Sequence, residues 1–167
     1  MSDETMRHWM ICFFLGITTF PSISAEMSEP GKFSVCQIPL ITQTWNKAPR
    51  LVEGSNSRIN SNAGTTEQPY RLALKECLSN ECNNAAFQAS IPINIPKNGR
   101  YRVAIDQMLW IDTYDQKSKL EGVLCEHSGC APIRKIVQYD LQAGLHWVTL
   151  SGKAASEVGL LVTEVND

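Results

Sequence analysis

The residues with the most chemical potential lie in one short segment, Cys125-Glu-His-Ser-Gly-Cys130. Two thiols and the imidazole of His127 could bind zinc or copper, with His146 or Cys36 as a fourth ligand. The same two thiols could instead close a disulfide, which would remove them as metal ligands. We expect the disulfide and no bound metal or cofactor, and the metal site is the alternative. His127 is then an exposed turn residue and a candidate for ligand binding.

A second cysteine pair has the same spacing, in Cys77-Leu-Ser-Asn-Glu-Cys82. Both four-residue spacers contain turn-forming residues, and the Cα atoms of a disulfide need to approach only to about 5.5 Å. The sequence therefore predicts two local disulfides, Cys77 with Cys82 and Cys125 with Cys130. Cys36 is the expected free thiol, although sequence alone also allows other pairings.

Catalytic constellations are not evident. Asp106 and Asp112 are six residues apart, which in a regular strand is about 20 Å and exceeds the roughly 5–9.5 Å between glycosidase carboxyl groups. Ser55, Ser57 and Ser118 lie in polar segments without a G-x-S-x-G turn. We therefore expect that the protein is not an enzyme.

Aromatic residues give the better indication of binding. An exposed Trp or Tyr can stack on a sugar ring or on an apolar residue of a partner. Of Tyr101, Trp110, Tyr114 and Trp147, we expect three to be buried in the core. Tyr114, which precedes Asp115 and Gln116, is predicted at the surface as a ligand-binding residue.

Composition limits the class of protein. The chain has 167 residues, of which 43% are hydrophobic and 19% charged, as in a folded domain. Lys and Arg total 15 against 17 Asp and Glu, a formal net charge of -2. Because no basic excess is available to hold a phosphate backbone, nucleic acid is not an expected partner.

The first residues predict a signal peptide over 1–25. An apolar run from Trp9 to Phe20 is too short for a bilayer core of about 30 Å, but it suits a signal-peptide core. Small residues, Ser22 and Ser24, follow it at positions that a signal peptidase recognises. We expect a periplasmic or secreted protein without a membrane span after cleavage, in a compartment where disulfides persist.

The rest of the chain is typical of a β protein. Residues 26–69 contain one predicted strand, 33–42, placed at a sheet edge by Pro39, and then an exposed Ser/Asn/Gly-rich loop from 46 to 69. Residues 70–167 form the predicted domain, with strands at 70–74, 85–95, 100–112, 120–124, 133–141, 145–150 and 158–165. Turn-forming residues at 96–99, 142–144 and 151–153 predict hairpins between successive strands.

The two-residue periodicity of these segments predicts a two-layer fold. Val137, Tyr139 and Leu141 share one face, and Gln138 and Asp140 share the other. We predict an all-β, antiparallel, jelly-roll-like β-sandwich of seven to eight strands. Its predicted core contains Val103, Ile105, Trp110, Val137, Tyr139 and Trp147.

Several motifs in residues 85–167 also occur together in a known group. They are Gly99-Arg-Tyr-Arg-Val-Ala-Ile, Trp110-Ile-Asp, His127-Ser-Gly-Cys130, Ile133-Arg-Lys, Leu141-Gln-Ala-Gly and Thr149-Leu-Ser-Gly152. In their order the sequence resembles small exported proteobacterial proteins whose β-sandwich is similar to the pre-peptidase C-terminal domain. Some of those proteins carry a homogentisate dioxygenase label, and that chemistry needs two His and a carboxylate on one open face.

Together these patterns predict an exported, disulfide-bearing, non-catalytic binding or accessory module. The expected ligand is a protein or carbohydrate surface. The alternative is a periplasmic metal-binding protein that holds zinc or copper through Cys125, His127 and Cys130.

The leader gives a first testable prediction. N-terminal sequencing of the exported protein should return a chain that begins at Ala25 or Glu26, because only residues 1–25 combine an apolar run with small residues at its end. Soluble exported protein that still begins at Met1 or Met6 would contradict the prediction.

Overall fold

The computed structural model describes residues 39–55, 58, 62–77, 82, 85–127, 131–153 and 155–165. All of them belong to one compact unit, which extends from 33 to 167. The predicted signal peptide and Cys36 lie outside the described residues. Among the described residues, no helix is long and apolar enough to cross a membrane.

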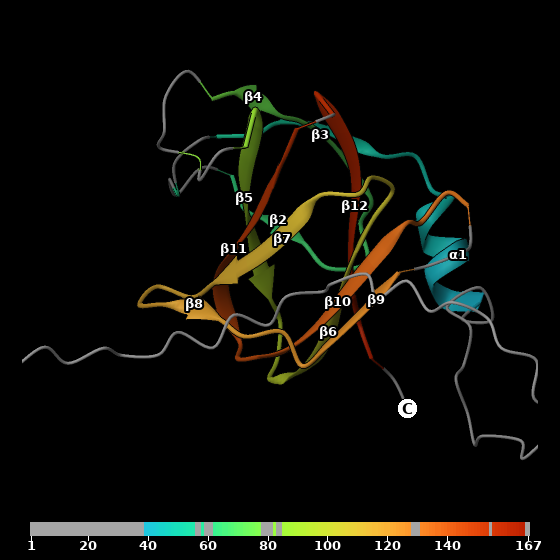
Figure 1. Cartoon of the computed structure of the whole chain (residues 1–167). Coiled ribbons are helices and arrows are strands. Elements are labelled where there is room, and N and C mark those ends of the chain that lie inside the picture. Colours follow the sequence, from blue (N-terminus) through green and yellow to red (C-terminus); the bar gives the residue numbers. More distant parts are fainter. Residues whose placement is uncertain are drawn as a thin grey trace, which may run out of the picture. The chain divides into compact units, whose positions relative to one another are not determined.

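The described chain is mostly β, with one short helix and twelve strands (Figure 1). The elements are α1 (Pro39–Trp45), β1 (Arg50–Glu53), β2 (Gly64–Thr65), β3 (Tyr70–Ala73), β4 (Lys75–Glu76), β5 (Phe87–Ile95), β6 (Gly99–Ile105), β7 (Trp110–Tyr114), β8 (Lys119–Leu120), β9 (Leu124–His127), β10 (Lys135–Leu141), β11 (Gly144–Gly152) and β12 (Glu157–Glu164).

Two sheets contain these strands. The first sheet has the order β1-β3-β12-β6-β10-β9, and the second has the order β2-β5-β11-β7-β8 with β4 also paired to β5. Among the described strands, eight of the ten pairings are antiparallel, whereas β1 with β3 and β2 with β5 are parallel. The predicted all-β class is confirmed, but both sheets are mixed rather than purely antiparallel.

The three predicted hairpins are wrong. β5 and β6 lie in different sheets, as do β10 and β11, and β11 and β12. Turn-forming residues reverse the chain, but they do not decide whether the next strand pairs with the previous one or packs beneath it. Two of these turns are joined, because the backbone N–H of Ala143 donates to Asn98 Oδ1 at 2.7 Å.

The predicted strand 100–112 is divided between the sheets. β6 ends at Ile105 in the first sheet, and β7 begins at Trp110 in the second. Asp106 fixes the break, since its Oδ2 accepts from Arg71 Nη1 and its Oδ1 accepts from the backbone N–H of Gly159, each at 2.7 Å. A half-buried carboxylate held by two donors at this point ends the regular strand and starts the crossing.

One hydrophobic core lies between the inner faces of the two sheets. The central strands of both sheets contribute every second residue to this core. Its members include Tyr70, Leu72, Ile91, Ile93, Ile95, Tyr101, Ile105, Tyr139, Leu141, Leu150 and Leu160. Of the predicted core, Val103, Ile105, Val137 and Tyr139 are confirmed, Trp147 is buried but lies outside this core, and Trp110 is wrong because it is 55% exposed.

Helix α1 replaces part of the predicted strand 33–42, of which residues 33–38 lie outside the description. Pro39 occupies its first position, where a missing N–H has no cost. Ile41 packs on the outer face of the first sheet against Ala104, Ile136 and Leu161, which are neighbours on β6, β10 and β12. The face of β10 expected to be solvated is therefore partly covered.

The predicted loop 46–69 contains two strands, and its glycines allow close approach. A Cβ on Gly54 would collide with the side chain of Ala89, and one on Gly64 would lie 2.7 Å from the Tyr70 hydroxyl. That hydroxyl donates to the carbonyl of Thr65 at 3.0 Å and accepts from its N–H at 2.6 Å. At these two positions glycine is needed because the backbone packs tightly against the sheets, and not because the backbone has to be flexible.

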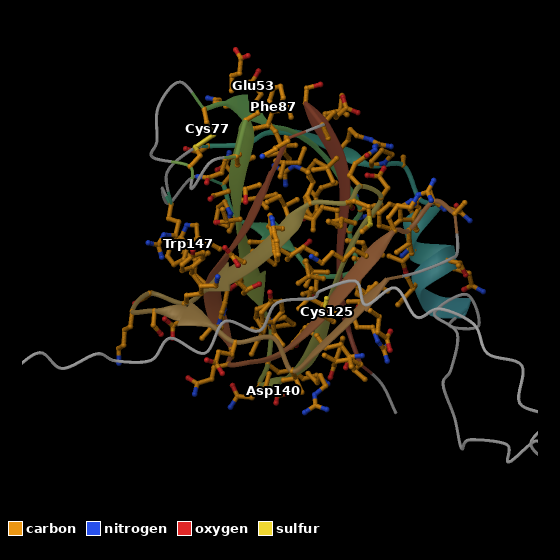
Figure 2. All side chains as sticks on the ribbon, viewed as in Figure 1. Glu53, Cys77, Phe87, Cys125, Asp140 and Trp147 are labelled. Atoms are coloured by element: carbon orange, nitrogen blue, oxygen red, sulfur yellow. A yellow bond between two sulfur atoms is a disulfide. The ribbon has the colours of Figure 1, made fainter. Side chains whose placement is uncertain are left out.

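The disulfide predicted between Cys77 and Cys82 is confirmed, with Cα atoms 6.1 Å apart. It closes the connection between β4 and β5, where Glu76 pairs with Phe87 (Figure 2). The backbone N–H of Cys77 donates to Ala86, and that of Ala85 donates to Cys82. The bond therefore reinforces a reversal that backbone hydrogen bonds already define.

Loss of this disulfide should weaken the fold without abolishing it. The double variant Cys77→Ser, Cys82→Ser should lose about 2 kcal/mol of unfolding free energy, because a short closed loop restricts the unfolded chain only modestly. Urea unfolding of both proteins measures the difference. A double variant that is unfolded without denaturant would contradict this expectation.

The packing of α1 gives a second stability prediction. Ile136→Ala should lower the unfolding free energy by about 2–5 kcal/mol, because it opens a cavity beneath Ile41. Gln138→Ala, two residues along the same face of β10, is the matched control and should cost under about 1 kcal/mol. Equal losses for the two variants would show that α1 does not pack there in solution.

Candidate binding face

The outer surface of the second sheet gathers aromatic and polar side chains. The residues of β7 alternate between its two faces. Ile111 and Thr113 point toward the core and are buried, whereas the outer face carries Trp110, Asp112 and Tyr114. β11 adds the residues directly across from them, in the pairs Ser151 with Trp110, Thr149 with Asp112 and Trp147 with Tyr114. We call this surface, made of Trp110, Asp112, Tyr114, Trp147, Thr149 and Ser151, the aromatic face.

Trp110 is the most exposed aromatic ring on this face. Its side chain is held by Lys135 of β10, whose Nζ lies 5.0 Å from the ring centroid and donates to the carbonyl of Leu109 at 3.1 Å. Lys135 is only 6% exposed, although it interrupts the apolar face of its strand. The cation–π contact restricts the indole from one side. Sequence reasoning missed this role of Lys135.

Asp112 lies between the two rings of β7 on the same face. Its Oδ1 pairs with Lys119 Nζ at 2.6 Å, from the neighbouring strand β8. The side chains are 30% and 57% exposed, so the pair is accessible at the surface and adds little stability. Asp106 is bound to Arg71 and Gly159 instead, at the point where the chain crosses between the sheets.

Tyr114 was predicted at the surface and is half-buried. The guanidinium carbon of Arg58 lies 4.1 Å from the centroid of its ring. Trp147, across from it on β11, is buried although it belongs to the outer face. Arg58 was missed, because nothing in the polar segment around it predicts a contact with a strand more than fifty residues away.

The turn after β7 orients Lys119 toward Asp112. Asp115 Oδ1 accepts from the backbone N–H of Ser118 at 2.6 Å and of Lys117 at 2.7 Å. These hydrogen bonds, with that from Ser118 the larger influence, hold the pKa of Asp115 below its usual range. The carboxylate is therefore ionised at neutral pH and keeps the turn closed.

On the neighbouring strands β5 and β11, the hydroxyls of Ser90 and Thr149 form a buried hydrogen bond of 2.7 Å.

Cys125, on strand β9, lies elsewhere in the unit. Cys125 is half-buried on β9 across from Val137, and Figure 2 shows it well apart from Trp147. The backbone of His127 pairs with Lys135, but its side chain and residues 128–130 lie outside the description. Among the described side chains, no three His, Cys, Asp or Glu gather in a metal-binding arrangement. The disulfide between Cys125 and Cys130 and the alternative metal site stay predictions.

The aromatic face could have been found in part from sequence. Trp110, Asp112 and Tyr114 alternate with Ile111 and Thr113, which is the pattern of a strand with one outward face. The face offers a flat exposed ring, a carboxylate–ammonium pair and hydroxyls within one rigid sheet. Such a combination can bind the ring and hydroxyl groups of a ligand without reacting with it.

Comparison with known proteins adds no assignment: no family model matches the chain, and no curated protein matches its sequence. The resemblance to small exported β-sandwich proteins therefore stays a prediction that rests on the sequence motifs.

Proposed function

We propose that this protein is an exported, non-catalytic binding module that holds a saccharide on the aromatic face. The observation that carries the proposal is the exposure of Trp110 at the first position of strand β7. A Trp side chain offers about 200 Å² of contact area. Leaving half of it in water forgoes about 2–3 kcal/mol of burial free energy. A fixed, exposed indole is a suitable platform for stacking on a sugar ring.

The polar residues of the face favour a saccharide over a protein. A stable protein interface buries about 800 Å² on each partner and has few charged residues at its centre. Here the Asp112–Lys119 ion pair lies on the same face between the two β7 rings. The carboxylate, the ammonium and the hydroxyl of the partly exposed Ser151 can exchange hydrogen bonds with sugar hydroxyls.

The scaffold and the compartment fit the same proposal. Two sheets around one core support a jelly-roll-like β-sandwich, an architecture that lectin domains also use. The Cys77–Cys82 disulfide and the predicted leader support export to the periplasm or beyond. Binding then takes place where extracellular polysaccharides are accessible.

The proposal is tested by binding to a panel of neutral and acidic polysaccharides, measured by affinity electrophoresis and calorimetry. Trp110→Ala should weaken binding about tenfold or more, because it removes the stacking platform. It should cost about 2 kcal/mol of unfolding free energy, because nearly half of the ring is buried, and the variant should stay folded.

Leu51→Ala is the matched control, since Leu51 is 78% exposed on β1 of the first sheet. It should bind as the unsubstituted protein does. Absence of binding to every polysaccharide in the panel, or equal binding by Trp110→Ala, would overturn the proposal.

A further inference from the structure

We infer that the saccharide bound by the aromatic face is acidic, and that Arg58 binds its carboxylate groups. The inference rests on the proposed function and adds the chemical class of the ligand. It depends on how Arg58 is held, on which carboxylates of the face already have partners, and on the length of the face.

Arg58 is exposed, yet its guanidinium is held over the ring of Tyr114 at 4.1 Å. Ion pairs within the described part of the chain join other arginines, Arg71 and Arg100, to carboxylates but not Arg58. A stacked guanidinium keeps its N–H donors at its edge, in a planar fork that matches a carboxylate. Because the ring already orients the group, less side-chain entropy is lost when an anion binds.

The acidic side chains nearest in sequence to Tyr114 have other partners and do not compete with a ligand for the guanidinium of Arg58. Asp112 is paired with Lys119, and Asp115 accepts the two N–H groups of its own turn. Lys117 and Lys119 are both exposed next to Tyr114, on the turn and on β8. The end of the face that contains Tyr114 therefore presents Arg58 and Lys117 as cationic donors, although the whole chain has a formal charge of -2.

The spacing along β7 requires a ligand longer than one ring. Trp110 and Tyr114 are four residues apart, which corresponds to about 13 Å along a strand. A single sugar cannot stack on Trp110 and also reach the guanidinium above Tyr114. An extended chain of uronate units satisfies both contacts, with one ring on the indole and the carboxylate of another on Arg58.

The test compares three probes, polygalacturonate, neutral hydroxyethyl cellulose and dextran sulfate, on the full exported chain. Arg58→Gln should weaken binding to polygalacturonate about tenfold, as expected for loss of a charge-assisted hydrogen-bonded pair. It should leave any binding to the neutral polymer unchanged. Arg50→Gln is the matched control, because Arg50 is an exposed arginine on β1 of the other sheet.

The outcomes separate this inference from the proposed function. Equal binding of the neutral and carboxylated polymers, with no effect of Arg58→Gln, overturns the acidic ligand but leaves saccharide binding in place. Equal losses from Arg58→Gln and Arg50→Gln, or tighter binding of dextran sulfate than of polygalacturonate, indicate non-specific charge attraction and also overturn it. Failure of all three probes overturns the proposed function itself.

Discussion

The contact between the inner faces of the two sheets is the constraint on which the binding face depends. Tyr139 of β10 donates its hydroxyl proton to the carbonyl of Ile111 on β7, across the core, at 3.0 Å. Burial raises the pKa of Tyr139 above its usual value, so the hydroxyl stays protonated and remains a donor. The side chain of Ile111 is buried in the same core, so the alternation of the strand turns its neighbours Trp110 and Asp112 outward.

The same constraint explains how much of the fold could be predicted. Strand positions follow from the two-residue alternation, which burial on one face imposes on each strand separately. Strand partners do not follow, because Pro96 to Gly99 specifies a reversal that suits a hairpin and a crossing between sheets equally well. The crossing is decided by distant groups, such as the donation from Ala143 to Asn98 and from Gly159 to Asp106. These pairs are 45 and 53 residues apart, and no local pattern contains them.

The binding face was likewise predictable only in part, because some of its features follow from the local sequence pattern and others depend on contacts between residues far apart in the sequence. Three consecutive apolar residues, Leu109, Trp110 and Ile111, leave open which side chains turn inward, and size alone favours the wrong choice for Trp110. The structure turns Leu109 and Ile111 inward, with Leu109 packed where Gly152 has no side chain. Arg58 could not be predicted, since its contact with Tyr114 depends on the path of a polar segment and not on its composition.

Lys135 connects the stability of the core to the position of the binding ring. It pairs with Ile105 in the first sheet, at an inward position where an apolar residue would avoid the desolvation of an ammonium group. Its stem fills that position, while its charge reaches the Leu109 carbonyl and the face of Trp110 at the end of the core. An apolar side chain of similar length could fill the same space, but it could neither satisfy that carbonyl nor hold the indole. The buried charge is therefore better explained by the placement of Trp110 than by packing.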